Sequence, residues 1–291
     1  MSEDIAQFVE ELKRQEAAAK TVANYASDME CFARWFEQSR AEEFSAAATT
    51  PTDIRDYRSF LLTVQGCKPS TINRRLAALR KFFSWAKATR KVEEAPTEAV
   101  KGIRSDPRAP KALDKREVDR LIRMVEKDGS KRDLAILQTL RHTGLRVGEL
   151  CALRLDDVEI SERKGRLTVR SGKGSKHREV PLNVDARRAI SAYQEVRPEV
   201  VDDHLFIGQR GEGLKVQAVE NIVEKYARLA GLEEVTPHTL RHTFGTQVLR
   251  SGEDLVTVAR LLGHERIETT AIYTQPNQRD LERAVERLET R

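Results

Sequence analysis

The chain has 291 residues, which is enough for two domains of ordinary size, each with a buried core. Its formal net charge of +5 identifies no partner, because 33% of the residues are charged and most of them must be solvated surface. No apolar run approaches membrane-spanning length, and the acidic N-terminus is unlike a signal peptide. We therefore expect a cytoplasmic protein without membrane attachment.

The three cysteines, Cys31, Cys67 and Cys151, stand singly in apolar helical contexts. None belongs to a C-x-x-C pair or has the Cys/His spacing of a zinc site. We expect buried, reduced thiols, with neither a disulfide framework nor redox chemistry.

The first hundred residues predict helices. Apolar residues recur there at three- and four-residue spacing, as in a helix that faces a core: Val22, Tyr25, Met29, Phe32 and Phe36. Thr50 followed by Pro51 has the order of an N-cap and a first helical turn, so a further helix is expected to begin there.

A helix with two distinct faces is predicted after Pro69. Its apolar stripe contains Ile72, Leu76, Leu79, Phe83 and Ala86. The segment between Cys67 and Val92 has no acidic residue, and its cations are Lys68, Arg74, Arg75, Arg80, Lys81, Lys87, Arg90 and Lys91. A merely solvated face usually mixes acids with cations, so we favour contact with the DNA backbone.

A linker is predicted over residues 103–112, where two prolines and several cations follow Gly102. Asp114 and Glu117 then have the spacing of a capping box at the start of a helix. The expected organisation is a helical domain over 1–102, the linker over 103–112 and a second domain over 113–291.

The second domain is predicted to be mostly helical with a small antiparallel sheet. A helix ends at Gly144, shortly before Arg146. Apolar residues alternate on both sides of SGKGSK, which predicts a β-hairpin with Lys173 at its tip. Only helices are expected after the hairpin, at about 185–197, 215–230, 237–251, 254–262 and 269–273 and near the C-terminus.

Two short segments resemble a nucleotide-binding loop and a zinc site, but neither has the residues that such a site requires. SGKGSK is not a phosphate-binding loop for nucleotides, because Leu167 stands where that motif requires a glycine and Gly174 where it requires Ser or Thr. His238 and His242 have a zinc-site spacing, but Arg241 lies between them on the helix, and a guanidinium repels a dication. We expect no metal and no cofactor.

A set of cations and one phenol recurs along the second half in a fixed order: Arg146, Lys173, His238, Arg241, His264 and Tyr273. Taken alone, each has an ordinary interpretation, such as a surface arginine paired with Glu149 or a tyrosine packed near a helix end. Taken together, two guanidiniums can hold a phosphate, imidazoles and an ammonium can move protons, and the phenol can attack. The set therefore predicts phosphoryl transfer on nucleic acid.

With the phrases TGLRVGEL, GKGSKHREVPL, HTLRHTFGT and LLGH, the chain resembles the tyrosine recombinase/integrase family over nearly its whole length. The short Xer-type and transposon-resolvase members are the most similar. Every catalytic position of that family is occupied by one of the six residues above, and Glu149 fits its acidic position.

The resemblance implies a fold and a mechanism. The expected fold is mainly α, with an N-terminal helical core-binding (SAM-like) domain and a mixed α/β catalytic domain of the tyrosine recombinase type. Tyr273 would attack a DNA phosphate to give a 3′-phosphotyrosyl link, with His238 as general base. Lys173, or less favourably Lys176, would protonate the leaving 5′-oxygen, and the family's arginines and His264 would stabilise the transition state.

The resemblance also implies an assembly on double-stranded DNA. Four protomers would act on two DNA sites, linked by their C-terminal segments, and an accessory protein that sets directionality is compatible with this. In this chain the segment carries an apolar stripe of Leu281, Val285 and Leu288, which would dock either on a neighbouring protomer or on its own domain.

Two other functions stay open at the level of sequence. One is a DNA-binding regulator or accessory protein that keeps the fold without turnover, although such a binder has no use for the nucleophile. The other is a DNA-relaxing activity like that of type IB topoisomerases, which recombinant product from two sites would exclude. The target sequence and the biological task, whether dimer resolution, cointegrate resolution or integration, are not encoded in any recognisable motif.

Overall fold

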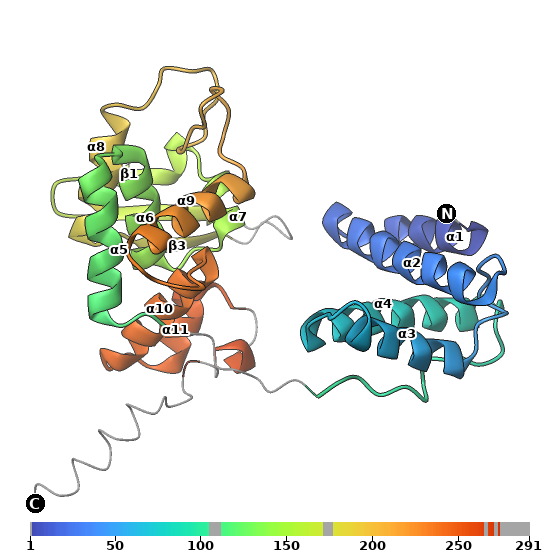
Figure 1. Ribbon diagram of the computed structural model, residues 1–291. Coiled ribbons are helices and arrows are strands. Elements are labelled where there is room, and N and C mark those ends of the chain that lie inside the picture. The colour runs from blue at the N-terminus through green and yellow to red at the C-terminus, as the bar shows by residue number, and fades with distance from the viewer. Residues whose placement is uncertain (1, 105–111, 171–176, 265–266, 271–272, 274–291) are drawn as a thin grey trace, which may run out of the picture. The chain divides into compact units, whose positions relative to one another are not determined.

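The computed structural model describes residues 2–104, 112–170, 177–264, 267–270 and 273. It divides into two compact units, Met1–Pro107 and Arg108–Arg291 (Figure 1), and each has its own hydrophobic core. Among the described residues, no helix has both the length and the apolar character needed to cross a membrane.

The first unit is a helical bundle with an aromatic core. Its helices are α1 (Glu3–Arg14), α2 (Ala19–Arg40), α3 (Pro51–Thr63) and α4 (Pro69–Ala88). Phe8 meets Phe82 edge to face at 5.3 Å between ring centroids, and Phe32 meets Tyr57 in the same way at 5.0 Å. These contacts join α1 to α4 and α2 to α3 across the interior of the unit.

The predicted apolar stripes of this unit are confirmed. The α4 stripe is buried along its whole length, and the α2 stripe is buried except for the half-buried Tyr25. The predicted start of α3 is also confirmed, because the Thr50 hydroxyl accepts from the Asp53 backbone N–H at 3.3 Å and the Asp53 carboxylate accepts from the Thr50 N–H at 2.7 Å.

The second unit contains helices around a small sheet. Its elements are α5 (Lys115–Asp128), α6 (Lys131–Thr143), α7 (Val147–Ala152), η1 (Leu155–Asp157), β1 (Val158–Ile160), β2 (Gly165–Arg170), β3 (His177–Pro181), α8 (Val184–Gln194), α9 (Val216–Leu229), α10 (Pro237–Arg250), α11 (Leu255–Leu262) and η2 (Ile267–Thr269). The strands are antiparallel in the order β1-β2-β3. The predicted fold class is thereby confirmed.

The predicted hairpin corresponds to β2 and β3. Leu167 pairs with Val180, and both side chains are fully buried, so the alternation read from the sequence places these residues on the core face. The hairpin tip, with Lys173 and Lys176, lies outside the described residues.

Three details differ from the prediction. Strand β1 was not expected, because three residues are too few to show an alternating pattern. The region after the hairpin is not purely helical, since Ile207 and Gly213 form an isolated antiparallel bridge. Of the helix predicted over 269–273, residues 271 and 272 lie outside the described residues, and the described ones follow a 3₁₀ pattern, in which Thr270 N–H donates to the Ile267 carbonyl at 2.8 Å. Neighbouring β-branched threonines disfavour a longer α-helix there.

The cysteines are free, as expected, but none is fully buried. Cys31, Cys67 and Cys151 are all half-buried and have no disulfide partner. Burial raises the pKa of the Cys151 thiol to about 11, so it is protonated and unreactive at neutral pH.

Candidate active site

The site is built around the turn that follows α6. Gly144 ends this helix with φ +61°, and a Cβ added there would lie 2.5 Å from the Phe244 ring and 2.7 Å from Leu262. Because only glycine tolerates both this backbone conformation and this closeness, α6, α10 and α11 meet at one point. The turn delivers Arg146 to the beginning of α7.

Arg241 on α10 is held from two sides. Its side chain is almost fully buried, with Nη1 donating to the Gly144 carbonyl at 2.6 Å and Nη2 donating to the Leu262 carbonyl at 2.8 Å. Burial, followed by the nearby Arg146 charge, lowers the pKa of Arg241 to about 10. The guanidinium therefore remains charged at neutral pH and is fixed in place before any substrate arrives.

Arg146 is the more accessible guanidinium. Its side chain is 49% exposed, while Nη1 donates to Glu149 Oε1 at 3.0 Å and Nη2 donates to the Gly263 carbonyl at 3.3 Å. The Arg146 backbone N–H donates to Glu149 Oε2 at 2.8 Å, which places the carboxylate at the N-terminus of α7. Arg146 is thus oriented by contacts within the protein and still has surface to offer a ligand.

Glu149 has a second cationic partner that the sequence did not predict. Arg178 on β3 donates through Nη1 to Oε1 at 2.8 Å and through Nη2 to Oε2 at 2.7 Å. Burial of Glu149 raises its pKa, but the Arg178 hydrogen bonds, the Arg146 backbone N–H and the two positive charges lower it to about 2. Glu149 is ionised at neutral pH and acts as a fixed anchor for both arginines.

Tyr273 belongs to a small apolar cluster close to Arg241. It is only 7% exposed and packs against Val258 and Leu262. A Cβ added to Gly245 of α10 would lie 2.9 Å from two atoms of the phenol ring, so the absence of a side chain at this position makes room for the ring. Burial raises the pKa of Tyr273, whereas the charges of Arg241 and Arg146 and a hydrogen bond with Arg241 act in the opposite direction.

Two imidazoles lie next to the phenol. The ring of His242 stacks on Tyr273 at 4.8 Å between centroids, and the ring of His264 is nearly parallel to it at 6.2 Å. His264 Nδ1 is 2.8 Å from the hydroxyl of the buried Thr270, which orients the imidazole. Burial is the main cause that lowers the pKa of each histidine to about 4, so both are neutral at pH 7.

His238 sits in the first turn of α10. Thr236 caps this helix and Pro237 is its first residue, as predicted. The pKa of His238 is lowered, first by partial removal from water and then by the charges of Arg241 and Arg146. A neutral imidazole at the N-terminus of a helix can accept a proton near a bound anion.

The structure therefore brings five of the six predicted residues into one electrostatically coupled group: Arg146, His238, Arg241, His264 and Tyr273. Lys173 lies outside the described residues. Sequence reasoning missed Arg178 and the stacking role of His242. Both occur within phrases that were recognised, but their partners are distant in sequence.

The cations of the first unit are less available than their sequence suggested. Arg74 pairs with Asp28, Lys87 with Glu98 at 3.3 Å, and Lys91 with Asp4 at 2.7 Å, while Arg80 donates to the Val100 carbonyl at 2.8 Å. The half-buried Arg75 is also close to Asp28, at 3.9 Å. The acids come from other elements, so the acid-free segment did not reveal them. Among the described residues, Lys68, Lys81 and Arg90 are exposed and form no such pair.

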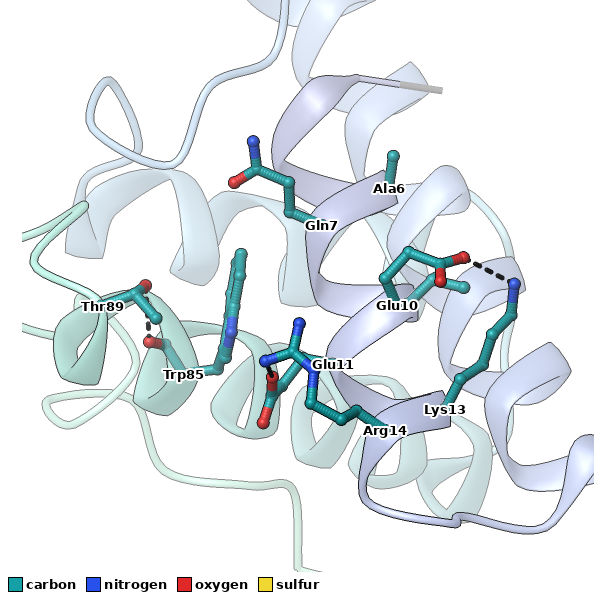
Figure 2. A pocket seen from close by; sticks show the side chains of 9 residues that line it. Ala6, Gln7, Glu10, Glu11, Lys13, Arg14, Trp85 and Thr89 are labelled. Carbon is teal, nitrogen blue, oxygen red and sulfur yellow. Dashed lines mark hydrogen bonds and ion pairs between the residues drawn. The ribbon is translucent and has the colours of Figure 1, made fainter.

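A separate pocket of about 500 Å³ lies in the first unit between α1 and the end of α4 (Figure 2). Its α1 wall carries the ion pairs Lys13–Glu10 at 2.6 Å and Arg14–Glu11 at 2.8 Å, and Trp85 forms the opposite wall. It contains none of the predicted site residues. Within the described part of the chain, the single group with metal-ligand geometry is Asp202, Asp203 and His204, which are not part of the candidate site.

The helical first unit, the hairpin-bearing second unit and the Arg/His/Tyr site match the arrangement expected for DNA strand-breaking and strand-rejoining enzymes. Two family models match the chain: the phage integrase N-terminal SAM-like domain over residues 5–90 and the phage integrase family over residues 111–280. The chain belongs to the phage integrase family of tyrosine recombinases.

Similar proteins extend over almost the whole chain. Tyrosine recombinase XerC of Thermodesulfovibrio yellowstonii is 34% identical, with coverage of 93% of this chain and 90% of the relative. Tyrosine recombinase XerD of Ralstonia nicotianae is also 34% identical, with coverage of 94% and 89%. Neither name indicates a regulator without turnover or a topoisomerase.

Solved structures share the fold. The crystal structure of the XerH site-specific recombinase bound to its difH substrate, in a post-cleavage complex, aligns with a TM-score of 0.78 at 22% identity, covering 98% of this chain and 85% of that one. The XerA recombinase aligns with a TM-score of 0.58 at 29% identity, covering 99% of both chains.

Proposed function

We propose that this chain is a site-specific DNA recombinase that cuts and rejoins strands through a 3′-phosphotyrosyl intermediate. The observation that carries the proposal is the buried Tyr273 phenol beside the fixed Arg241 guanidinium, with Arg146 exposed nearby. A phenol has a pKa of about 10, so it becomes a useful nucleophile at neutral pH when cations favour the phenolate or a base removes its proton.

Tyr273 Oη attacks the scissile phosphorus while the bond from phosphorus to the 5′-oxygen breaks. His238 accepts the phenol proton, and Lys173 gives a proton to the leaving oxygen, which becomes a free 5′-hydroxyl. Attack by the 5′-hydroxyl of a partner strand reverses the step, and the aryl phosphodiester retains the bond energy, so no ATP is needed.

Positive charge in this mechanism comes from side chains. Arg146 and Arg241 would hydrogen-bond the non-bridging oxygens of the phosphate, with His264 as a further donor, as negative charge grows in the transition state. Because guanidiniums occupy the place that metal ions take in many phosphoryl-transfer enzymes, we propose that cleavage needs neither metal nor cofactor.

The wider organisation is also proposed. Residues 1–102 would bind core DNA, residues 103–112 would connect the domains, and residues 113–291 would carry out catalysis and dock to a neighbour. Four protomers on two DNA sites, in the cytoplasm and with or without an accessory directionality protein, would form the working assembly. The DNA-bound structures of similar recombinases support double-stranded DNA as the partner.

Tyr273→Phe tests the proposal on a nicked half-site substrate. The variant should form no denaturation-resistant adduct, while its affinity for duplex DNA stays close to that of the wild type because the phenol oxygen alone is lost. Adduct formation by the variant would refute the assignment. A plasmid with two target sites should yield recombinant product, and relaxed circles alone would favour the topoisomerase-like alternative.

A further inference from the structure

Glu149 is shared by two arginines of unequal exposure. Arg178 contributes both of its terminal nitrogens, at 2.8 and 2.7 Å, and its side chain is 17% exposed. Arg146 contributes its backbone N–H at 2.8 Å and Nη1 at 3.0 Å. Arg178 Nε is buried without a hydrogen-bond partner in the described structure, so the hydrogen bonds that this guanidinium makes all go to Glu149.

The charges of this cluster determine what Arg146 can offer a phosphate. Arg146 and Glu149 alone would form a neutral pair, in which the carboxylate competes with the phosphate for the guanidinium. With Arg178 present, the three groups carry a net charge of +1. Because Arg178 occupies both carboxylate oxygens, Arg146 keeps a single side-chain bond to Glu149 and remains half exposed.

Arg178 also supports the turn that precedes His264. Gly263 has φ +65°, and a Cβ added there would lie 2.7 Å from Arg178 Nη1 and 2.8 Å from Cζ. The Gly263 carbonyl accepts from Arg146 Nη2 at 3.3 Å. The guanidinium of Arg178 thus packs against the backbone segment that contacts Arg146.

We propose that Arg178 is a positioning residue that satisfies Glu149, so that the Arg146 guanidinium is left free to hold the scissile phosphate. This inference rests on the proposed function. Arg178 does not touch the phosphate in this scheme, and its contribution passes through Glu149 and Arg146.

The test compares single-turnover cleavage by the full chain for Arg178→Gln, Glu149→Gln and the double variant, with half-site affinity measured in parallel. Arg178→Gln should cleave roughly 10²-fold more slowly, the size of effect seen when one transition-state donor is lost, with little change in affinity. In Glu149→Gln the new side-chain amide can still accept the Arg146 backbone N–H but carries no charge. Glu149→Gln should therefore be slowed less than Arg178→Gln, and the double variant should recover to the rate of Glu149→Gln alone.

Arg40→Gln is a matched control. Arg40 donates to Asp53 through Nε at 2.8 Å and Nη2 at 2.9 Å, and Asp53, like Glu149, is the third residue of a helix and accepts from the N-cap backbone. This variant removes the same kind of ion pair without a neighbouring site arginine. It should lower thermal stability without slowing the cleavage step.

If Arg178→Gln cleaves at the wild-type rate, Arg178 has no positioning role. The same conclusion follows if the double variant cleaves as slowly as Arg178→Gln. If Arg178→Gln does not fold, the double variant decides, since a rate tenfold or more below that of Glu149→Gln contradicts the proposal. If the wild type forms no adduct, it is the proposed function that fails.

Discussion

At the scale of single residues, the environment of His238 sets the pH dependence of the first step. Burial and the charges of Arg241 and Arg146 lower its pKa, so the basic form is populated below the ordinary histidine range. A general base works when deprotonated, so cleavage should rise with pH through this lowered pKa and be level by neutral pH.

A pH–rate profile of single-turnover cleavage checks this expectation. The midpoint of the acid limb should fall below about 6.5, the unperturbed histidine value. In His238→Asn the limb should be lost together with most of the rate. A wild-type midpoint well above that value would mean that another group accepts the proton.

Lys173 is the second residue whose role can be isolated by chemistry. Lys173→Ala should slow cleavage of normal DNA by about 10²- to 10⁴-fold, the usual contribution of a general acid. Replacing the leaving 5′-oxygen by sulfur should restore most of the rate, because a thiolate leaves without a proton. Lys176→Ala is the control, and its cleavage rate relative to the wild type should be the same on normal DNA and on the sulfur-substituted DNA. Equal defects of Lys173→Ala on both substrates would move the general acid elsewhere.

At the scale of elements, α4 and the turn that follows it carry both free and paired cations. Lys81 is exposed and has no paired carboxylate among the described residues, whereas Lys91 is half-buried against Asp4 at 2.7 Å. Each phosphate contact releases counterions, so losing one contact lowers the slope of log affinity against log salt by about 1.

Lys81→Gln should therefore reduce this slope, and Lys91→Gln should leave it unchanged while lowering thermal stability. Fluorescence anisotropy titrations at several salt concentrations give both slopes. An unchanged slope in Lys81→Gln, or a reduced slope in Lys91→Gln alone, would contradict this division between cations that contact DNA and cations that pair within the protein.

Elements with local signals could be predicted from the sequence. The starts of α3, α5 and α10 are set by capping residues three positions apart, such as Thr50 with Asp53. The local sequence is therefore enough to predict where these helices begin. The short strand β1 has no such signal. It forms because β2 lies alongside it, with Val158 paired to Leu167.

In the site, too, contacts between sequence neighbours could be predicted and contacts between distant residues could not. Arg146 and Glu149 are neighbours on one helix turn, and their pairing follows from spacing. Arg178 is 29 residues from Glu149 in the sequence, and the two meet only because β3 folds back beside α7. No local pattern in either segment predicts this contact. Likewise, the acids that pair with the cations of α4 and of the turn after it come from α1, α2 and the segment after α4, so local charge counting overestimated the free basic surface.

At the scale of the whole molecule, the segment after Tyr273 is proposed to join protomers. Ending the chain at Gln278 removes Leu281, Val285 and Leu288, while both units and the α4 cations remain. Binding to a single site should be largely intact, whereas pairing of two sites and strand exchange should be lost. Native gel electrophoresis and a two-site recombination assay separate these outcomes. Normal exchange by the shortened chain would mean that the segment only caps its own domain.

Tyr273 is proposed to carry the DNA covalently during strand exchange. The most direct measurement is mass spectrometry of the protein–DNA adduct trapped on a nicked half-site in the presence of EDTA. If Tyr273 is the nucleophile, the adduct should contain a nucleotide joined through its 3′-phosphate to the peptide that contains Tyr273, and the released strand should carry a free 5′-hydroxyl. An adduct on another residue, a link through a 5′-phosphate, or an adduct that requires magnesium would contradict this mechanism.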